Sequence, residues 1–144
     1  MSIFTPAPAP WPSRVLSIVR IVFGLLFITF GTTKLFGWPS VAQEMPPIPA
    51  FSQMWIGAWM EVIGGILITI GLFTWPVAFI LAGEMAVAYF QFHFRFPQAF
   101  WPQQNMGIGA VMYCWFFLYL VFSGAGEWSV DAAIARNRGE RVSS

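Results

Sequence analysis

The stretch WMEVIGGILITIGLF, residues 59–73, decides the fold class because it is almost wholly apolar and yet carries one carboxylate, Glu61. A helix needs about 20 mainly apolar residues to cross the hydrocarbon core of a bilayer. The apolar run around this stretch extends from about Met54 to Phe73, so we interpret it as a membrane span. A lone carboxylate at that depth is costly without a partner. Glu61 is therefore expected to face other parts of the protein and not lipid.

The composition of the whole chain supports a membrane protein. Of the 144 residues, 58% are hydrophobic, 19% are aromatic and only 9% are charged, whereas about 25% of residues are charged in ordinary soluble domains. The formal net charge of +1 gives no reason to expect nucleic acid as a partner. The one cysteine, Cys114, excludes a disulfide or a CxxC redox pair within the chain, and we interpret it as a packing residue.

Four apolar runs have the length of a span, so the sequence predicts an all-α integral membrane protein. Within a domain at 14–126, the expected spans are residues 14–36, 54–73, 75–94 and 106–123. Their short connections favour an antiparallel up-and-down four-helix bundle, and Ser13 is expected to cap the first helix. A disordered Pro-rich tail at 1–13 and a cytoplasmic amphipathic tail at 127–144 are expected outside it, with short interfacial helices in the C-terminal tail and the first outer loop.

Basic residues beside the spans predict the orientation, because cytoplasmic segments carry more Lys and Arg. The residues beside the two termini are Arg14, Arg136, Arg138 and Arg141, against Lys34 and Arg95 beside the other two loops. We therefore expect both termini to be cytoplasmic.

The first two expected spans carry their charged residues on the same face as their glycines. Residues three, four or seven positions apart share one side of a helix. The two stripes are Gly57, Glu61, Gly64, Ile68 and Gly71 in the second span and Arg20, Gly24, Phe27, Gly31 and Lys34 in the first. Glycines let a neighbouring backbone come close, so these stripes are expected to face other helices.

The depths of the charged residues predict two ion pairs. At about 1.5 Å per residue, Arg20 lies about 9 Å from the start of its span and Glu84 about 13 Å from the start of the third, so the two could meet. Lys34, near the outer end of the first span, can reach Glu61. Alternatively, either glutamate could be protonated. Such residues either fix helix packing only or form a site for a polar head group or a proton path. The sequence leaves both explanations open.

His93 is the single histidine and stands at the outer end of the third expected span. At about 100° per residue it lies about 180° round the helix from Glu84. It is interpreted either as a residue that hydrogen-bonds lipid head groups or as a ligand or proton carrier. We do not expect haem, because the single histidine has no evident second axial ligand. We do not expect a metal, because the sequence has no cluster of His and Cys.

Several of these features recur together in one known family. They are Arg20, Gly24, Gly31 and Lys34, the motif E-x-x-G-G-x-L-x-x-x-G from Glu61 to Gly71, an acidic and aromatic third span ending in His93, then Asn105, and GAGEWSVD at 124–131. In order and spacing the chain after Arg14 resembles the DoxX family of small bacterial membrane proteins. One departure is at the fourth span, where members commonly read N-G-G-E-x-A and this chain reads NMGIGA, with Ile108 in place of the glutamate.

The resemblance implies a four-helix protein of the bacterial inner membrane that is linked, in some relatives, to quinone-coupled sulfur oxidation, terminal oxidase complexes or oxidative-stress systems. On this basis we expect an accessory subunit of a quinone-linked redox system, with the bilayer and a membrane protein or complex as partners. The candidate polar site, with quinone as candidate cofactor, consists of Arg20, Lys34, Glu61, Glu84 and His93. Two alternatives remain: a structural or assembly subunit without chemistry of its own, and a small proton or solute transporter.

Overall fold

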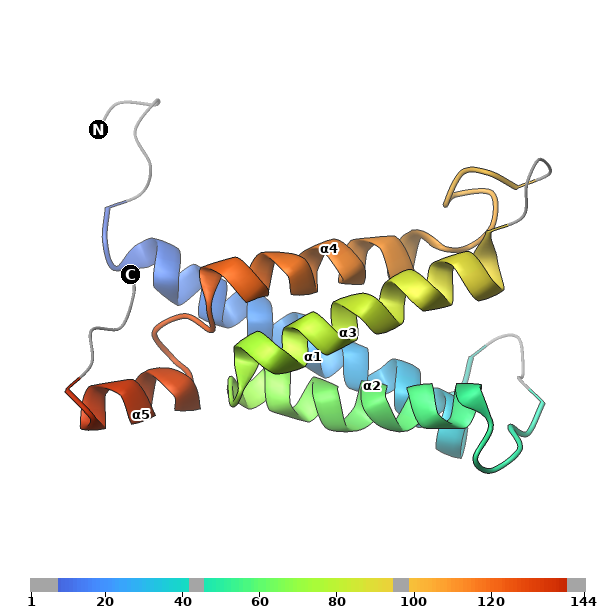
Figure 1. Ribbon diagram of the computed structural model, residues 1–144, viewed down its shortest axis with the longest axis horizontal. Coiled ribbons are helices and arrows are strands. Elements are labelled where there is room, and N and C mark those ends of the chain that lie inside the picture. The colour runs from blue at the N-terminus through green and yellow to red at the C-terminus, as the bar shows by residue number, and fades with distance from the viewer. Residues whose placement is uncertain (1–7, 42–45, 95–98, 140–144) are drawn as a thin grey trace.

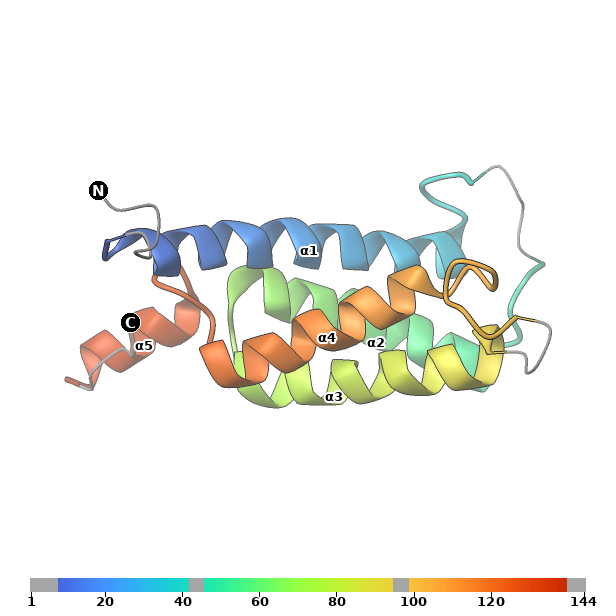
Figure 2. The ribbon, with the colours of Figure 1, turned by 90° about the horizontal axis from the view of Figure 1, so that it is seen from above.

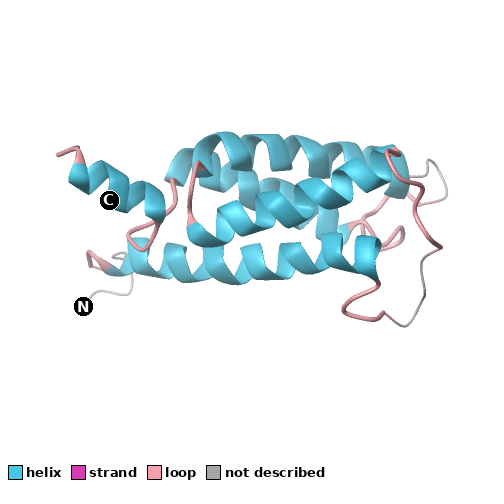
Figure 3. Ribbon diagram, turned by 90° about the horizontal axis from the view of Figure 1, so that it is seen from below, coloured by secondary structure: helices cyan, strands magenta, loops and turns pink. Residues whose placement is uncertain are grey.

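The computed structural model describes residues 8–41, 46–94 and 99–139, and within these ranges the chain is helical with no β-strand (Figure 3). The elements are α1 (Trp11–Phe36), α2 (Gln53–Ile70), α3 (Thr74–Ala88), a π-helical turn η1 (Tyr89–His93) that continues α3, α4 (Ile108–Ser123) and α5 (Val130–Asn137).

The four longer helices lie lengthwise beside one another (Figures 1 and 2). The closest neighbours are α1 with α2 and α3 with α4, while α2 and α3 meet less extensively. Figure 1 shows α2 and α3 close together at the turn that joins them and farther apart toward their other ends. Figure 2 shows that the start of α1 extends well beyond this turn. That offset decides which charged residues can meet.

Three of the helices are long and apolar enough to cross a membrane. They are α1, α2 and α3 together with η1, with 26, 18 and 20 residues. The helix α4 is apolar but has only 16 residues, which corresponds to about 24 Å against a hydrocarbon core of about 30 Å. It begins at Ile108 and not at Met106, because Met106 has a positive φ of 60° and cannot continue a helix.

Large apolar side chains cover the outer faces of these helices. Soluble proteins rarely expose apolar patches of more than a few hundred Å². Residues that are more than half exposed include Leu25, Ile63, Phe79, Phe90, Trp115 and Phe122. A surface of this kind is expected where lipid chains surround the protein. The structure therefore supports the conclusion from the composition that this is a membrane protein.

The start of the first helix differs from the sequence expectation. The helix α1 begins at Trp11 and not at Arg14, and Ser13 lies in its first turn, so the expected cap is wrong. Pro12 fits there because the first helical residues have no intrahelical N–H partner to lose. At the other end, Ser129 does cap a helix: its Oγ accepts from the N–H of Ala132 at 3.1 Å.

The expected interfacial helices are not confirmed. The first loop forms no helix in residues 37–41 and 46–52, and 42–45 lie outside the described part. The C-terminal helix α5 exists, but it points roughly along the long axis of the molecule, beside the start of α1 (Figures 1 and 2). A helix lying in the membrane plane would run across that axis.

Glycines bring α1 and α2 into close contact, as the two stripes predict. Arg20, Gly24, Phe27 and Gly31 are buried along α1. A methyl group on Gly31 would run into the carbonyl oxygen of Ala58 on α2. A rigid backbone oxygen cannot move aside as a flexible side chain can. The spacing between these two helices therefore depends on the absence of side chains.

Replacing Gly31 with alanine is expected to lower the free energy of unfolding by about 1–3 kcal/mol, as overpacking typically does. The matched control is Gly83→Ala, because a methyl group there meets nothing within 4 Å and alanine favours a helix by up to about 1 kcal/mol. Unfolding in mild detergent, followed by circular dichroism, measures both. Equal stability of the two variants would contradict the packing argument.

Candidate functional site

Arg20 is completely buried and holds three parts of the chain together. Its Nε donates to the carbonyl oxygen of Ala125 at 2.7 Å, and Nη2 donates to that of Trp128 at 2.6 Å. Nη1 donates to the carbonyl oxygens of Ile68 and Thr69 in the last turn of α2. The last carbonyls of a helix have no intrahelical partner and carry partial negative charge, which suits a guanidinium.

The predicted pair between Arg20 and Glu84 is therefore wrong. The prediction placed the starts of the first and third spans at the same depth, whereas α1 begins well before the level of the α2–α3 turn (Figure 2). Arg20 thus lies level with the end of α2, while Glu84 lies farther along α3. Arg20 belongs to the framework at this end of the molecule.

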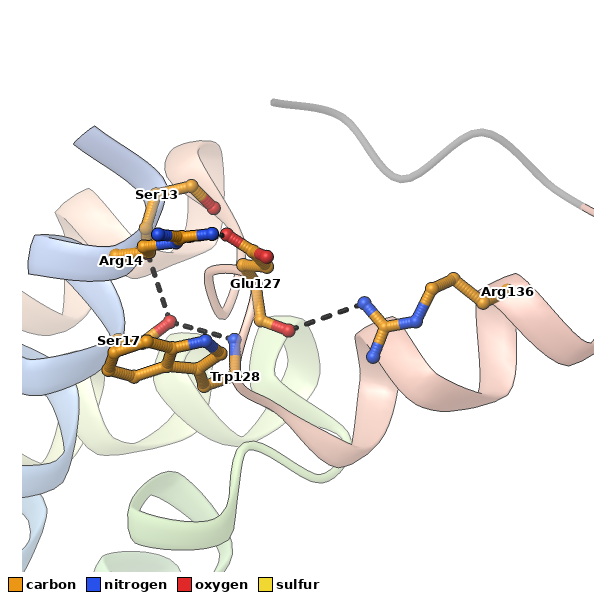
Figure 4. A network of polar contacts seen from close by, with 6 residues as sticks. All are labelled: Ser13, Arg14, Ser17, Glu127, Trp128 and Arg136. Atoms are coloured by element: carbon orange, nitrogen blue, oxygen red, sulfur yellow. Dashed lines mark hydrogen bonds and ion pairs between the residues drawn. The ribbon is translucent and has the colours of Figure 1, made fainter. Parts of the chain in front are cut away.

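The loop between α4 and α5 packs onto the start of α1 (Figure 4). Ser17 Oγ donates to the carbonyl of Ser13 and accepts from the N–H of Trp128 at 3.0 Å. Arg14 Nε lies 3.2 Å from Glu127 Oε2. Gly126 has a φ of +82°, and a side chain there would collide with Ser17. The GAGEWSVD segment is thus a structural element that closes this end of the molecule.

Asp131 joins the same framework through the α2–α3 turn. Its carboxylate accepts from the N–H groups of Phe73 at 2.9 Å and Thr74 at 2.8 Å, and its own N–H donates to Gly71. Asp131 lies in the first turn of α5. The bond to the start of α3 was missed because nothing in the sequence places α5 beside that turn.

Lys34 and Glu61 form the second predicted pair, and this one is confirmed. Lys34 Nζ lies 2.5 Å from Glu61 Oε1. The Glu61 side chain is only 3% exposed, whereas that of Lys34 is 27% exposed. The lysine stem descends from the last turn of α1 to a carboxylate near the middle of α2. A charge pair is therefore buried between these two helices.

Glu84 joins this pair from α3. It lies within electrostatic range of both Glu61 and Lys34. Its Oε1 would lie 3.2 Å from a methyl group placed on Gly57 of α2, so the glycine makes room for the carboxylate. The sequence placed Gly57 on the correct stripe but did not connect it with Glu84. We call Lys34, Glu61 and Glu84 the carboxylate site.

Each glutamate of the carboxylate site has a carboxyl oxygen without a hydrogen-bond partner. Oε2 of Glu61 and Oε2 of Glu84 are both buried and unpaired within the described residues. Buried polar atoms are nearly always hydrogen-bonded, because leaving one unpaired costs about 1–3 kcal/mol. These two acceptors belong to different helices and lie near one lysine. A bound molecule that donates hydrogen bonds would satisfy them.

His93 lies apart from the carboxylate site. Its Nδ1 is 3.0 Å from the carbonyl oxygen of Asn105, and it is nine residues, or about 13 Å along the helix, beyond Glu84. The Asn105 side chain accepts from Gly107 N and donates to the carbonyl of Ala99, which shapes the loop before α4. The structure thus separates the five predicted site residues into Arg20, the carboxylate site and His93.

An apolar groove on the outer side of α2 and α3 was not predicted. Its volume is about 310 Å³. Its walls are Trp55, Ile56, Trp59, Met60, Ile63, Gly64, Leu67, Val77, Ile80 and Leu81. The Trp59 indole N–H is buried and unpaired within the described chain. Large apolar residues recurring at helical spacing from Trp55 to Leu67 are the sequence signal that could have located it.

Other candidate chemistry is limited in the part of the chain that the structure describes. No three His, Cys, Asp or Glu side chains come together there as a metal site would require. Cys114 is half-buried as a free thiol in α4. Ile108, which replaces the glutamate expected from the resemblance, is 42% exposed at the start of α4.

Comparisons with known proteins assign this chain to a family. The family model described as DoxX matches residues 15–94. An uncharacterised protein of Haemophilus influenzae is 38% identical over 117 residues, covering 81% of this chain and 87% of that protein. The Escherichia coli inner membrane proteins YqjF and YphA are 29% and 30% identical, over 79% and 81% of this chain and 87% and 88% of their own lengths. No solved structure matches. The family match over more than half of the chain, together with these relatives, shows that the protein is a member of the DoxX family.

Proposed function

We propose that this protein is an accessory subunit of a quinone-linked redox system in the bacterial inner membrane, and that its carboxylate site holds the quinone head group. The observation that carries the proposal is the pair of buried, unpaired carboxyl oxygens of Glu61 and Glu84 beside Lys34. Ionisable residues at membrane depth commonly mark sites for a substrate, an ion or a proton. If these residues served packing alone, their polar atoms would be expected to be hydrogen-bonded to one another.

The groups at the site suit a quinone-type molecule. Such a head group exchanges carbonyl oxygens for hydroxyl groups when it is reduced, so it needs both donors and acceptors around it. Lys34 supplies N–H donors, and the two glutamates supply acceptors. The apolar groove on the outer side of α2 and α3 offers a surface for a hydrocarbon tail. When bound, a quinone would supply the redox chemistry, which the chain's own side chains lack.

The topology that belongs to this proposal is an antiparallel four-span bundle with both termini cytoplasmic. It is supported by the gathering of Arg14, Arg136 and Arg138 at the end where α1 starts, against Lys34 at the other end. Arg95 and Arg141, which also entered the prediction, lie outside the described residues. In this arrangement α4 is a short fourth span, and the names of the two Escherichia coli relatives agree with an inner-membrane location.

Purification from native membranes in mild detergent tests the proposal. Mass spectrometry of the lipid extract and of co-eluting polypeptides is expected to show stoichiometric quinone with the unmodified chain. The Glu61→Gln, Glu84→Gln double variant is expected to lose it, because both acceptors change. Glu127→Gln is the matched control: it makes the same substitution at the other end of the molecule, where Glu127 pairs with Arg14, and it should retain quinone.

Two outcomes would contradict the proposal. One is a tightly held protein partner with no quinone in any sample, which would favour a structural or assembly subunit. The other is equal quinone content in the folded double variant and the control, which would move any quinone site elsewhere. Circular dichroism and size-exclusion chromatography confirm that each variant is folded.

A further inference from the structure

We propose that the carboxylate site binds one proton at neutral pH, and that Glu84 carries this proton while Glu61 stays ionised beside Lys34. The inference goes beyond the proposed function, because it holds whether or not a quinone is bound. It rests on the charges that three helices bring together and on the position of each carboxyl group.

The three side chains of the site do not balance one another when all are ionised. Lys34 supplies one positive charge, whereas Glu61 and Glu84 supply two negative charges. Among the described residues, the charges that act on Glu84 are those of Glu61 and Lys34. The neighbouring helix α4 has no acidic or basic side chain between Ile108 and Ser123. An ionised carboxylate without compensation is costly in an apolar environment, so one bound proton, which makes the site neutral, is favoured.

The positions of the two carboxyl groups assign the proton to Glu84. Glu61 Oε1 lies 2.5 Å from Lys34 Nζ, and so close a cation favours the ionised form. Among the described residues Glu84 has no ion-pair partner, and its Oε2 is buried without a hydrogen bond. Glu84 also stands ten residues after the start of α3, or about 15 Å, which is half of a hydrocarbon core of about 30 Å. Desolvation therefore acts on Glu84 with the least compensation.

Infrared spectroscopy of the full chain tests the inference, because a protonated carboxyl group has a C=O band separate from the bands of a carboxylate. The protein is measured in a maltoside detergent, which has no carbonyl group of its own. At neutral pH the unmodified chain is expected to show this band, and Glu84→Gln should lose it. Glu127→Gln is the matched control and should keep the band, because Glu127 is partly exposed and pairs with Arg14.

Removal of the lysine charge tests the charge balance independently. In Lys34→Met a neutral site needs two protons, so Glu61 should also become protonated and the band intensity should rise about twofold. The double variant Lys34→Met, Glu84→Gln should return to one protonated carboxyl group, now on Glu61. Both results are read as intensities relative to the amide band of the same sample.

Shortening each carboxylate side chain in turn identifies which residue carries the proton. Glu84→Asp keeps a carboxyl group but moves it by one methylene, so the band should remain and shift in frequency. Glu61→Asp should leave the frequency of the unmodified chain. The conservative Glu84→Asp variant also keeps the test available if Glu84→Gln does not fold.

Three outcomes would overturn the inference. Absence of the band in the unmodified chain would mean that both carboxyl groups are ionised. A band that persists in Glu84→Gln, or that shifts in Glu61→Asp and not in Glu84→Asp, would place the proton elsewhere. An unchanged intensity in Lys34→Met would contradict the charge balance. Quinone content is measured separately, so each of these outcomes leaves the proposed function to its own test.

Discussion

Replacing Arg20 with methionine is expected to cause the largest loss of stability of any single substitution considered for this protein. The side chain is completely buried and donates to four backbone carbonyl oxygens. Methionine fills a similar volume but donates nothing. Removal of the guanidinium leaves these carbonyl oxygens without their donors, and because each buried unpaired acceptor costs about 1–3 kcal/mol, we expect a total loss of about 3–5 kcal/mol. Denaturant-induced unfolding in mild detergent measures it.

The matched control is Arg14→Met, six residues earlier on the same helix. Arg14 also contacts the α4–α5 loop, but its side chain and that of Glu127 are 37% and 35% exposed. Exposed ion pairs contribute about 0–1 kcal/mol, so this variant should be nearly as stable as the unmodified chain. A conservative Arg20→Lys variant should recover only part of the loss, because an ammonium cannot reproduce the planar fork of donors. Equal stability of Arg20→Met and Arg14→Met would contradict the framework role.

Replacing Lys34 with methionine is expected to have the second largest effect. It leaves Glu61, which is 3% exposed, without its cationic partner. The loss should approach the lower end of the range for a broken buried pair, about 3 kcal/mol, because Lys34 itself is partly exposed and water can reach its position. Unfolding of the folded variant in detergent, under the same conditions as for Arg20, gives the value.

A double-mutant cycle isolates the interaction between the two residues. Glu61→Gln removes the charge that Lys34 neutralises, so the double variant Lys34→Met, Glu61→Gln should be more stable than the sum of the two single losses predicts. We expect a coupling energy of about 1–3 kcal/mol. The corresponding cycle on Arg14 and Glu127 should give less than about 1 kcal/mol. Additive losses at Lys34 and Glu61 would mean that the short contact contributes nothing to stability.

The sequence also predicted which helix faces come together, and the reason is periodicity. Residues at helical spacing share a face whatever the rest of the chain does. The stripes through Gly31 on α1 and Gly64 on α2 therefore identified buried faces, and both are buried. The pairing of Lys34 with Glu61 followed, because both lie on those stripes and the connecting loop joins the ends of their helices.

Relative depth was the point at which sequence reasoning failed. The prediction compared the distances of Arg20 and Glu84 from the starts of their own helices. Such distances do not show whether the two helices start at the same depth, and α1 begins well beyond the α2–α3 turn. Arg20 therefore contacts the end of α2, whereas Glu84 lies beside Gly57 and within electrostatic range of the Lys34–Glu61 pair. The same offset leaves a place beside α1 that α5 occupies.

The sequence by itself determined that this is a helical membrane protein, which of its faces are buried, and that charged residues lie among its helices. Composition and periodicity are properties of the chain alone, so they are readable without a structure. Only the tertiary structure decided what each charge does. The partners of Arg20 are backbone carbonyls, which every residue possesses and no sequence pattern marks. Glu61 and Glu84 lie near each other only because α2 and α3 bring them there from opposite sides of a turn.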